Sequence, residues 1–180
     1  MKIYFVRHGQ TDENFRGITL GNQADVSINA EGIRQVRALK LDNDFDIIFS
    51  SPLKRCLQTA QILNEILKKQ LIIHPDLIER GKGTLEGKTM QEIEEFTNGL
   101  INEDFFAKNW EADFSPYGGD SIEEVRTRVK RFINEMLEKY KDKKILVSTH
   151  MGVIKVLYCL YGDKALANLD NSALNVIEIN

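Results

Sequence analysis

Short apolar runs alternate with helical patterns along this chain of 180 residues, and that alternation limits its fold more than any other feature. The runs are rich in Ile, Val, Leu and Phe, as expected of buried strands. Between them, apolar residues recur three and four positions apart, which is the spacing of an amphipathic helix. Strands are predicted at residues 2–6, 46–50, 71–74, 144–149 and 174–179, and helices at residues 29–40, 53–69, 121–141 and 151–161.

Strands that alternate with helices form a mostly parallel sheet that is covered on both faces. We therefore predict an α/β fold, a three-layer α/β/α sandwich with a mostly parallel central sheet. A chain of this length suits one domain, which we place over residues 1–180. The longest helix should begin at Ser121, because Glu124 follows it at the spacing of a capping box.

The composition argues against several classes of protein. The chain is 42% hydrophobic and 28% charged, and its formal net charge is -3. It has no basic patch large enough to indicate a nucleic-acid partner. No segment approaches the roughly 20 apolar residues of a membrane span, so we expect no membrane partner either.

The two cysteines, Cys56 and Cys159, each lie in an apolar helical pattern. Two thiols without a C-x-x-C pairing do not make a disulfide framework, so we expect both to be reduced core residues. The chain enters a strand pattern directly, without a secretory signal. These features predict a cytoplasmic protein.

Basic side chains follow three of the predicted strands at the point where each strand ends. Arg7 and His8 follow the first strand, Arg55 lies one turn into the helix that follows the second, and His150 follows the strand at 144–149. If these strands are parallel, their carboxyl ends meet at one edge of the sheet, where open α/β folds bind ligands. The sequence therefore predicts that two histidines and two arginines converge.

Such a cluster is suited to a phosphate group. A guanidinium is permanently charged and can donate two hydrogen bonds to phosphate oxygens, and helix N-termini also favour anions. Neutral imidazole is in addition a nucleophile at physiological pH. Nearby guanidiniums lower a histidine pKa and a bound phosphate raises it, so the net shift is left open. His74 has no such flanking residues, and we expect it to be a packed or surface histidine.

Five motifs in this chain closely resemble those of the histidine phosphatase superfamily, also called phosphoglycerate mutase-like proteins. They occur in the expected order between Ile3 and Leu157. They are "RHGQT" with Asn14 three positions on, "LGNQADVSINAEG", "SSPLKRCLQTA", "GGDS" and "STHMGVIKVL". The resemblance implies a phosphoglycerate mutase-like fold for the whole domain.

The resemblance also implies roles for individual residues. His8 would attack phosphorus and form a phosphohistidine, while Arg7, Arg55 and His150 would hold the phosphoryl oxygens. Glu79, in "LIERGKGTLEG", matches the general acid of the family, although the nearby Glu86 could take that role instead. The residues implied to bind substrate are Gln10, Thr11, Asn14, Gly21 and Met151.

No cofactor and no metal are expected. The three histidines are scattered, without H-x-H or H-E-x-x-H spacing and without a cysteine pair. The stretch "GTLEGKT" at residues 83–89 looks like a nucleotide-binding P-loop, but it has three residues between its first glycine and the Gly-Lys pair where that motif needs four. We interpret Gly81, Gly83 and Gly87 as turn residues around Glu79.

The region 97–119 fits the alternating pattern poorly. It combines five aromatic residues with polar residues and a Pro-Tyr-Gly-Gly turn. It is either an irregular segment held down by its aromatic side chains or a lid inserted over the ligand site. If it is a lid, the residues expected to contact the leaving group are Trp110, Phe114 and Tyr117.

The favoured function is hydrolysis of a small phosphorylated metabolite, as in broad-specificity or α-ribazole phosphatases. Cofactor-dependent phosphoglycerate mutases share the phosphate-binding motifs, but they are longer and carry an arginine pair that is missing between Glu79 and Gly119. A module that binds a phosphorylated ligand without turnover is the third alternative. The physiological substrate and the oligomeric state are left open, with a dimer among the options.

Overall fold

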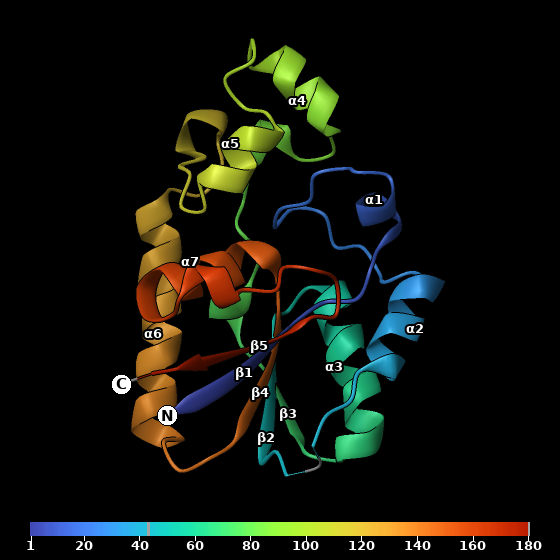
Figure 1. Cartoon of the computed structure of the whole chain (residues 1–180), viewed down its shortest axis with the longest axis vertical. Coiled ribbons are helices and arrows are strands. Elements are labelled where there is room, and N and C mark those ends of the chain that lie inside the picture. The colour runs from blue at the N-terminus through green and yellow to red at the C-terminus, as the bar shows by residue number, and fades with distance from the viewer. Residues whose placement is uncertain (43, 180) are drawn as a thin grey trace.

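A computed structural model describes residues 1–42 and 44–179 and contains a five-stranded sheet with the order β3-β2-β4-β1-β5 (Figure 1). The first four strands in this order run parallel, and β5 pairs antiparallel with β1. All five predicted strands are confirmed, with ends that differ by at most one residue. They are β1 Lys2–Arg7, β2 Ile47–Ser50, β3 Gln70–Ile73, β4 Ile145–Thr149 and β5 Leu174–Glu178.

The four predicted helices are present as α2, α3, α6 and α7, and three short helices, α1, α4 and α5, were not predicted. The α-helices are α1 Asp12–Phe15, α2 Ala30–Ala38, α3 Lys54–Leu67, α4 Met90–Phe96, α5 Glu103–Lys108, α6 Ile122–Lys139 and α7 Met151–Tyr161. The 3₁₀ helices are η1 Pro75–Leu77, η2 Gly83–Leu85, η3 Ser115–Tyr117 and η4 Lys164–Leu166.

Successive strand residues bury their side chains on opposite faces of the sheet. Phe5 and Val147 belong to the core cluster that includes α6 and α7, whereas Val6 and Leu146 belong to the cluster that includes α2 and α3. The two pairs of helices therefore cover opposite faces, as Figure 1 shows. The predicted three-layer α/β/α sandwich with a mostly parallel sheet is confirmed.

The long helix α6 begins with the predicted capping box. The Ser121 hydroxyl accepts the Glu124 N–H at 3.2 Å, and the Glu124 carboxylate accepts the Ser121 N–H at 2.8 Å. These two bonds satisfy backbone donors that a helix start would otherwise leave free. The apolar stripe of α6 is buried in the core, with Val129 and Phe132 among its members.

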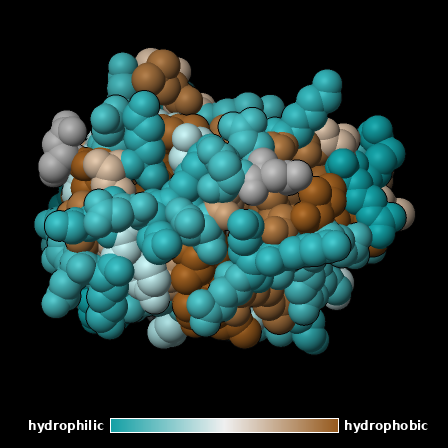
Figure 2. Space-filling model, turned by 90° about the horizontal axis from the view of Figure 1, so that it is seen from below, coloured by the Kyte–Doolittle hydropathy of each residue, from teal (hydrophilic) through white to brown (hydrophobic). Residues whose placement is uncertain are grey.

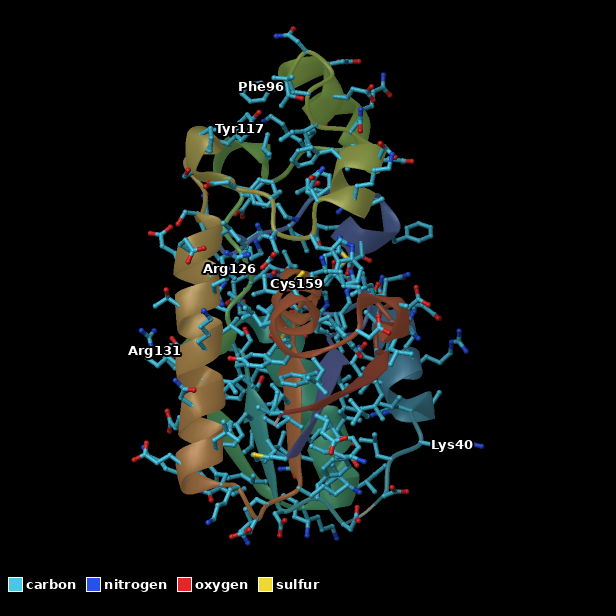
Figure 3. The ribbon with its side chains drawn as sticks, turned by 60° about the vertical axis from the view of Figure 1, so that its left-hand side comes forward. Lys40, Phe96, Tyr117, Arg126, Arg131 and Cys159 are labelled. Atoms are coloured by element: carbon cyan, nitrogen blue, oxygen red, sulfur yellow. The ribbon has the colours of Figure 1, made fainter. Side chains whose placement is uncertain are left out.

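The region between η1 and α6 forms a separate unit above the sheet, with its own small core of Leu85, Ile93, Ile101, Ala112 and Phe114, whereas Leu77 of η1 belongs to the main core. Helices α4 and α5 belong to this unit, which occupies the top of the molecule in Figures 1 and 3. Within it the predicted turn residues Gly83 and Gly87 have positive φ of 56° and 81°. A side chain at Gly83 would also collide with the Tyr117 carbonyl, so only glycine fits there.

The opposite end of the molecule carries mostly hydrophilic side chains, with apolar surface visible between them (Figure 2). The two chain ends lie close together near this end, where the Met1 amino group donates to the Ile179 carbonyl at 2.7 Å (Figure 1). Within residues 1–42 and 44–179, no helix has both the length and the apolar character needed to cross a membrane.

The parallel pairing of β1, β2 and β4 places their carboxyl ends at one edge. Arg7 is paired with Thr149, and Ser50 is paired with Ser148. The residues that follow these strands therefore emerge side by side, which is the arrangement that the sequence predicted for its basic residues.

The loop after β1 lies directly against the start of α2. The Asn29 N–H donates to the Gln10 carbonyl at 2.8 Å, and the Asn29 side chain caps α2 by accepting the Gly32 N–H at 2.8 Å. A Cβ at Gly32 would lie 2.3 Å from the Gln10 carbonyl oxygen, and one at Gly9 would lie 2.7 Å from the Gly32 carbonyl oxygen. Glycine at both positions allows α2 to hold the loop that carries His8.

We predict that Gly32→Ala lowers the free energy of unfolding by about 1–3 kcal/mol, because the methyl group would meet rigid backbone. Urea unfolding measures this change. Arg37→Ala on an exposed part of the same helix is the control and should unfold close to the wild-type midpoint. A wild-type midpoint for Gly32→Ala would show that the loop and the helix are not tightly packed.

Candidate active site

Three strand exits meet at the edge of the sheet and bring the predicted residues together. The His8 N–H donates to the Thr149 carbonyl and the Ser51 N–H donates to the Ser148 carbonyl, both at 3.0 Å. The imidazole rings of His8 and His150 are 5.3 Å apart between centroids. Residues far apart in the chain are thus joined into one site by the parallel strand pairing.

A pocket of about 370 Å³ opens at this edge. One part of its wall is polar or charged, and the other part is apolar and comes from the loop after α1, from the unit above the sheet and from the start of α7. The polar lining includes Arg7, His8, Asn14, Arg55, Glu79, Lys82 and Asn171, and the apolar lining includes Ile18, Leu20, Met90, Phe106 and Met151.

His8 is held as a neutral ring with one free nitrogen. Its Nδ1 lies 2.8 Å from the Gly9 carbonyl oxygen, which can only accept, so Nδ1 carries the proton. Burial, together with the nearby His150, Arg7 and Arg55, lowers the pKa of His8 well below 6.5. The lone pair is therefore on Nε2, which makes this atom a nucleophile at neutral pH.

His150 packs against His8, is fully buried and is not among the residues that line the pocket. Its Nε2 is 2.7 Å from the Ser51 hydroxyl and 3.3 Å from the Cys56 thiol. Burial and the positive charge of Arg55 lower its pKa well below 6.5, so this ring is also neutral. Burial raises the pKa of the Cys56 thiol to about 12, which keeps Cys56 protonated and unreactive.

The two guanidiniums are anchored by backbone carbonyls. Arg7 donates to Leu169, and Arg55 donates to Gly21 at 2.8 Å and to Ala24 at 2.9 Å. Within the described part of the chain, the buried Nε of each arginine has no hydrogen-bond partner. Two guanidiniums without a carboxylate bonded to them form a site that favours an anion.

Asn14 is oriented with its amide nitrogen available. Its Oδ1 accepts the Thr11 N–H at 3.3 Å and the Asn171 side-chain N–H at 3.2 Å. Because these contacts occupy the oxygen, the Asn14 NH₂ group is the part left to donate to an anion in the pocket. Asn171 also donates to the His8 carbonyl at 3.0 Å, and nothing in the sequence pattern pointed to it.

Glu79 enters the pocket beside the start of α7. Its carboxylate accepts the Arg80 N–H at 2.8 Å and the Gly152 N–H at 3.3 Å. A Cβ at position 152 would lie 2.4 Å from this carboxylate, so glycine makes the approach possible. Burial raises the pKa of Glu79, but Lys82, the two N–H groups and Arg55 outweigh burial and leave the pKa below 4.5.

Glu86, the other candidate acid, has a different position. Its carboxylate accepts the backbone N–H of Asn22 at 3.3 Å, of Gln23 at 3.1 Å and of Lys82 at 2.9 Å. It is not among the residues that line the pocket. These contacts give Glu86 the role of holding a loop, and the geometry favours Glu79 as the carboxyl group that faces a ligand.

Three of the residues implied to bind substrate, Gln10, Thr11 and Gly21, lie beside the pocket and do not line it. Thr11 caps α1, and the Gly21 carbonyl accepts from Arg55. Asn14 and Met151 do line the pocket. His74 lies away from the pocket and contacts Glu135 at 3.2 Å, as expected of a packed histidine.

The expectation that Trp110, Phe114 and Tyr117 contact the leaving group is wrong for the pocket that the structure contains. Phe114 is buried in the small core of the upper unit, and Tyr117 packs against that core. The side chain that faces the pocket is Phe106. The sequence could not distinguish these rings, because the helix α5 that orients Phe106 was not predicted.

Lys82 is a further pocket residue that the sequence patterns did not identify. Its ammonium donates to the Leu20 carbonyl at 2.8 Å and lies 5.6 Å from the centre of the Phe106 ring. Lys82 therefore adds a positive charge to a pocket that already holds two guanidiniums. Across the described residues, no group of three or more His, Cys, Asp or Glu side chains is placed to hold a metal ion.

The sequence model described as "Histidine phosphatase superfamily (branch 1)" matches residues 3–180 of the chain. A protein of Schizosaccharomyces pombe described as a probable phosphatase is 32% identical over 180 residues, which cover 97% of this chain and 79% of that protein. The metal-independent phosphoserine phosphatase of Arabidopsis thaliana is 30% identical over 185 residues, which cover 99% of this chain and 76% of that protein. The structure of α-ribazole phosphatase from Shigella flexneri has a TM-score of 0.78 and 25% identity, covering 100% of this chain and 91% of that one.

The neutral histidine pair should make stability fall as the pH falls. The unfolded chain binds protons near pH 6.5, whereas the pKa of folded His8 and His150 lies well below 6.5. Between 6.5 and the folded pKa values, the unfolded state binds more protons, so the free energy of unfolding decreases with decreasing pH. We predict that the free energy of unfolding, measured in urea between about pH 7.5 and 5.5, changes with pH by up to about 1.4 kcal/mol per pH unit for each histidine.

The double variant His8→Asn, His150→Asn is the control for this slope. Since it removes both rings, its stability should depend much less on pH in the same range. Equal slopes in the wild type and the double variant would contradict the conclusion that the folded rings resist protonation.

Proposed function

The chain belongs to the histidine phosphatase superfamily and is a phosphatase, and we propose that it hydrolyses small phosphomonoesters through a phosphohistidine formed on His8. The observation that carries this proposal is the state of His8. Its ring is neutral, its Nδ1 proton is engaged by Gly9, and its free Nε2 belongs to a pocket that holds two guanidiniums. A nucleophile and an anion site are thus combined in one pocket.

In the first step, the Nε2 lone pair of His8 attacks phosphorus and the bond from phosphorus to the ester oxygen breaks. Arg7, Arg55 and the Asn14 amide stabilise the negative charge on the phosphoryl oxygens by hydrogen bonds. His150 packs against the His8 ring. Glu79 gives a proton to the leaving oxygen. The products of this step are the free alcohol and phosphorylated His8.

In the second step, Glu79 takes a proton from a water molecule, and the water oxygen attacks phosphorus. The phosphorus–nitrogen bond breaks, inorganic phosphate leaves, and His8 returns to its neutral form. A covalent intermediate divides one difficult displacement into two easier ones. This matters for phosphate monoesters, whose hydrolysis is accelerated by enzymes by up to about 10²¹-fold.

The lowered pKa of Glu79 requires a source for the proton that it donates. In the empty pocket Glu79 is ionised at neutral pH, and its charge offsets part of the positive charge of Lys82 and Arg55. A bound phosphoryl dianion placed near the carboxylate raises the pKa of Glu79, because two like charges come close together. Substrate binding therefore favours the protonated acid that the first step needs.

We predict that Glu79→Gln slows the first step in proportion to how much the leaving group needs a proton. General acid catalysis is worth about 10²–10⁴-fold, so turnover of an alkyl phosphate should fall by this factor. Para-nitrophenol leaves readily as an anion, so its release in the first turnover, measured as a pre-steady-state burst, should slow by less than about tenfold. Steady-state turnover of both esters should fall, because Glu79 also activates the water of the second step. His8→Ala should abolish the hydrolysis of both esters, and EDTA should leave the wild-type rates unchanged.

Glu86→Gln is the matched control, since it changes the other nearby carboxylate without changing a pocket-lining group. A loss that depends on the leaving group in Glu86→Gln, with none in Glu79→Gln, would reverse the assignment. Conversion of 3-phosphoglycerate to 2-phosphoglycerate with a bisphosphoglycerate primer would identify a mutase instead. Binding of phosphate esters by the wild type without release of phosphate would identify a non-catalytic module.

A further inference from the structure

Lys155 is a buried cation that contacts the unit above the sheet. It lies on α7, one turn after Met151, and its side chain is only 8% exposed. Its Nζ donates to the backbone carbonyl of Phe106 on α5 at 2.9 Å. The Phe106 ring in turn lines the pocket.

The surroundings of Lys155 are unfavourable for a positive charge. Burial, together with Lys82 and Arg80, lowers the pKa of Lys155 to about 8, and Glu79 only partly compensates. Among the described residues, no carboxylate lies within ion-pair distance of its Nζ. A buried ammonium held mainly by a carbonyl costs more than an apolar side chain of similar length would. The contact with Phe106 therefore calls for an explanation other than stability.

The position of the Phe106 ring among its neighbours depends on where the Phe106 backbone is held. It packs against Phe114 with centroids 5.9 Å apart and an interplanar angle of 29°. The Lys82 ammonium lies 5.6 Å from the centre of the Phe106 ring, and the Arg80 guanidinium lies 4.9 Å from the centre of the Phe114 ring. A shift of the Phe106 backbone would move the ring relative to Lys82 and to the pocket.

The loop that follows α5 is held by Arg80, which donates to the carbonyls of Trp110 and Ala112. Trp110 and Ala112 follow α5 in the chain, whereas Phe106 lies within it. Lys155 is therefore the side chain of α7 that fixes the part of α5 nearest the pocket.

We propose that Lys155 is a positioning residue, which sets the Phe106 ring against the pocket so that this ring holds the leaving group of the phosphomonoester. This proposal rests on the proposed function, because a leaving group exists only if esters are bound there. Phe106 is the one phenyl ring among the described residues that line the pocket. Lys155 then affects the ester through Phe106 and leaves the phosphoryl group to Arg7 and Arg55.

The test compares binding of phenylphosphonate, which cannot be hydrolysed at its P–C bond, with binding of inorganic phosphate. Lys155→Met keeps the side-chain length but removes the donor, so phenylphosphonate should bind about tenfold more weakly, as expected for the loss of one charged hydrogen bond. The affinity for inorganic phosphate should change by less than about twofold, because no phosphoryl contact is lost. Lys155→Arg should restore wild-type binding of both ligands.

Lys164→Met is the matched control for the loss of charge. The Lys164 ammonium lies 5.9 Å from the Trp110 ring, close to the 5.6 Å of Lys155, but Lys164 is exposed and makes no hydrogen bond to Phe106. The Lys164→Met variant should bind both ligands as tightly as the wild type does. Trp110 is the single tryptophan of the chain, so its fluorescence should change in Lys155→Met, and the wild-type spectrum should return in Lys155→Arg.

A double-mutant cycle with Phe106→Ala tests whether Lys155 acts through the ring. Phe106→Ala keeps the carbonyl but removes the ring, so adding Lys155→Met to it should weaken phenylphosphonate binding no further. Equal weakening of phosphate and phenylphosphonate in Lys155→Met, or additive effects in the double variant, would overturn the positioning role.

The proposed function can fail independently of this result. A wild-type protein that binds phenylphosphonate but releases no phosphate from any ester would contradict hydrolysis, while the binding comparison would still decide the role of Lys155. With an active wild type, Lys155→Met should raise KM for phenyl phosphate by about tenfold and change kcat by less than about twofold. A loss confined to kcat would overturn the proposal.

Discussion

Mutual repulsion among positive groups around one pocket is the constraint on which the rest of this site depends. Arg7 and Arg55 are held there by backbone carbonyls, without a carboxylate bonded to either of them, and Lys82 lines the same pocket. Two further positive charges on His8 and His150 would be unfavourable, and both rings have a strongly lowered pKa. The same field keeps Glu79 ionised when the pocket is empty. One electrostatic environment therefore produces a free imidazole lone pair, an affinity for dianions and a carboxyl group whose protonation responds to the ligand.

The fold supplies this environment through backbone geometry. The parallel pairing of β1, β2 and β4 delivers the residues that follow them to one edge of the sheet. Glycines at close approaches then fix the details, since Gly32 lets α2 hold the His8 loop and Gly152 lets Glu79 reach the start of α7. The unit above the sheet adds part of the apolar wall, with Phe106 tied to α7 through Lys155. Phosphoryl recognition thus comes from the edge of the sheet, and we propose that recognition of the leaving group comes from the upper unit.

The parts of this structure that could be predicted from sequence are those specified by local periodicity and by ordered motifs. Strands and long helices have a clear apolar spacing, and the groups after the strands were expected to converge because the carboxyl ends of parallel strands lie at the same edge of a sheet. The upper unit could not be predicted in the same way. Its helices are 7 and 6 residues long, too short for a clear apolar period, and which ring faces the pocket depends on how they pack. Phe106 reaches the pocket through such packing, and without knowledge of it Trp110, Phe114 and Tyr117 were expected there instead. Lys82 and Asn171 reach the pocket from irregular loops before η2 and β5, which have no periodicity to predict them.

The central claim is that His8 Nε2 attacks phosphorus, and trapping the intermediate tests it most directly. An aryl phosphate labelled on phosphorus would be mixed with the protein, the reaction stopped within milliseconds to seconds in alkali, and the labelled peptide mapped by mass spectrometry. The account predicts an alkali-stable label on the Nε2 of His8 that decays as inorganic phosphate appears. A label on another residue, or hydrolysis that proceeds at full rate with no labelled protein at any time, would contradict it.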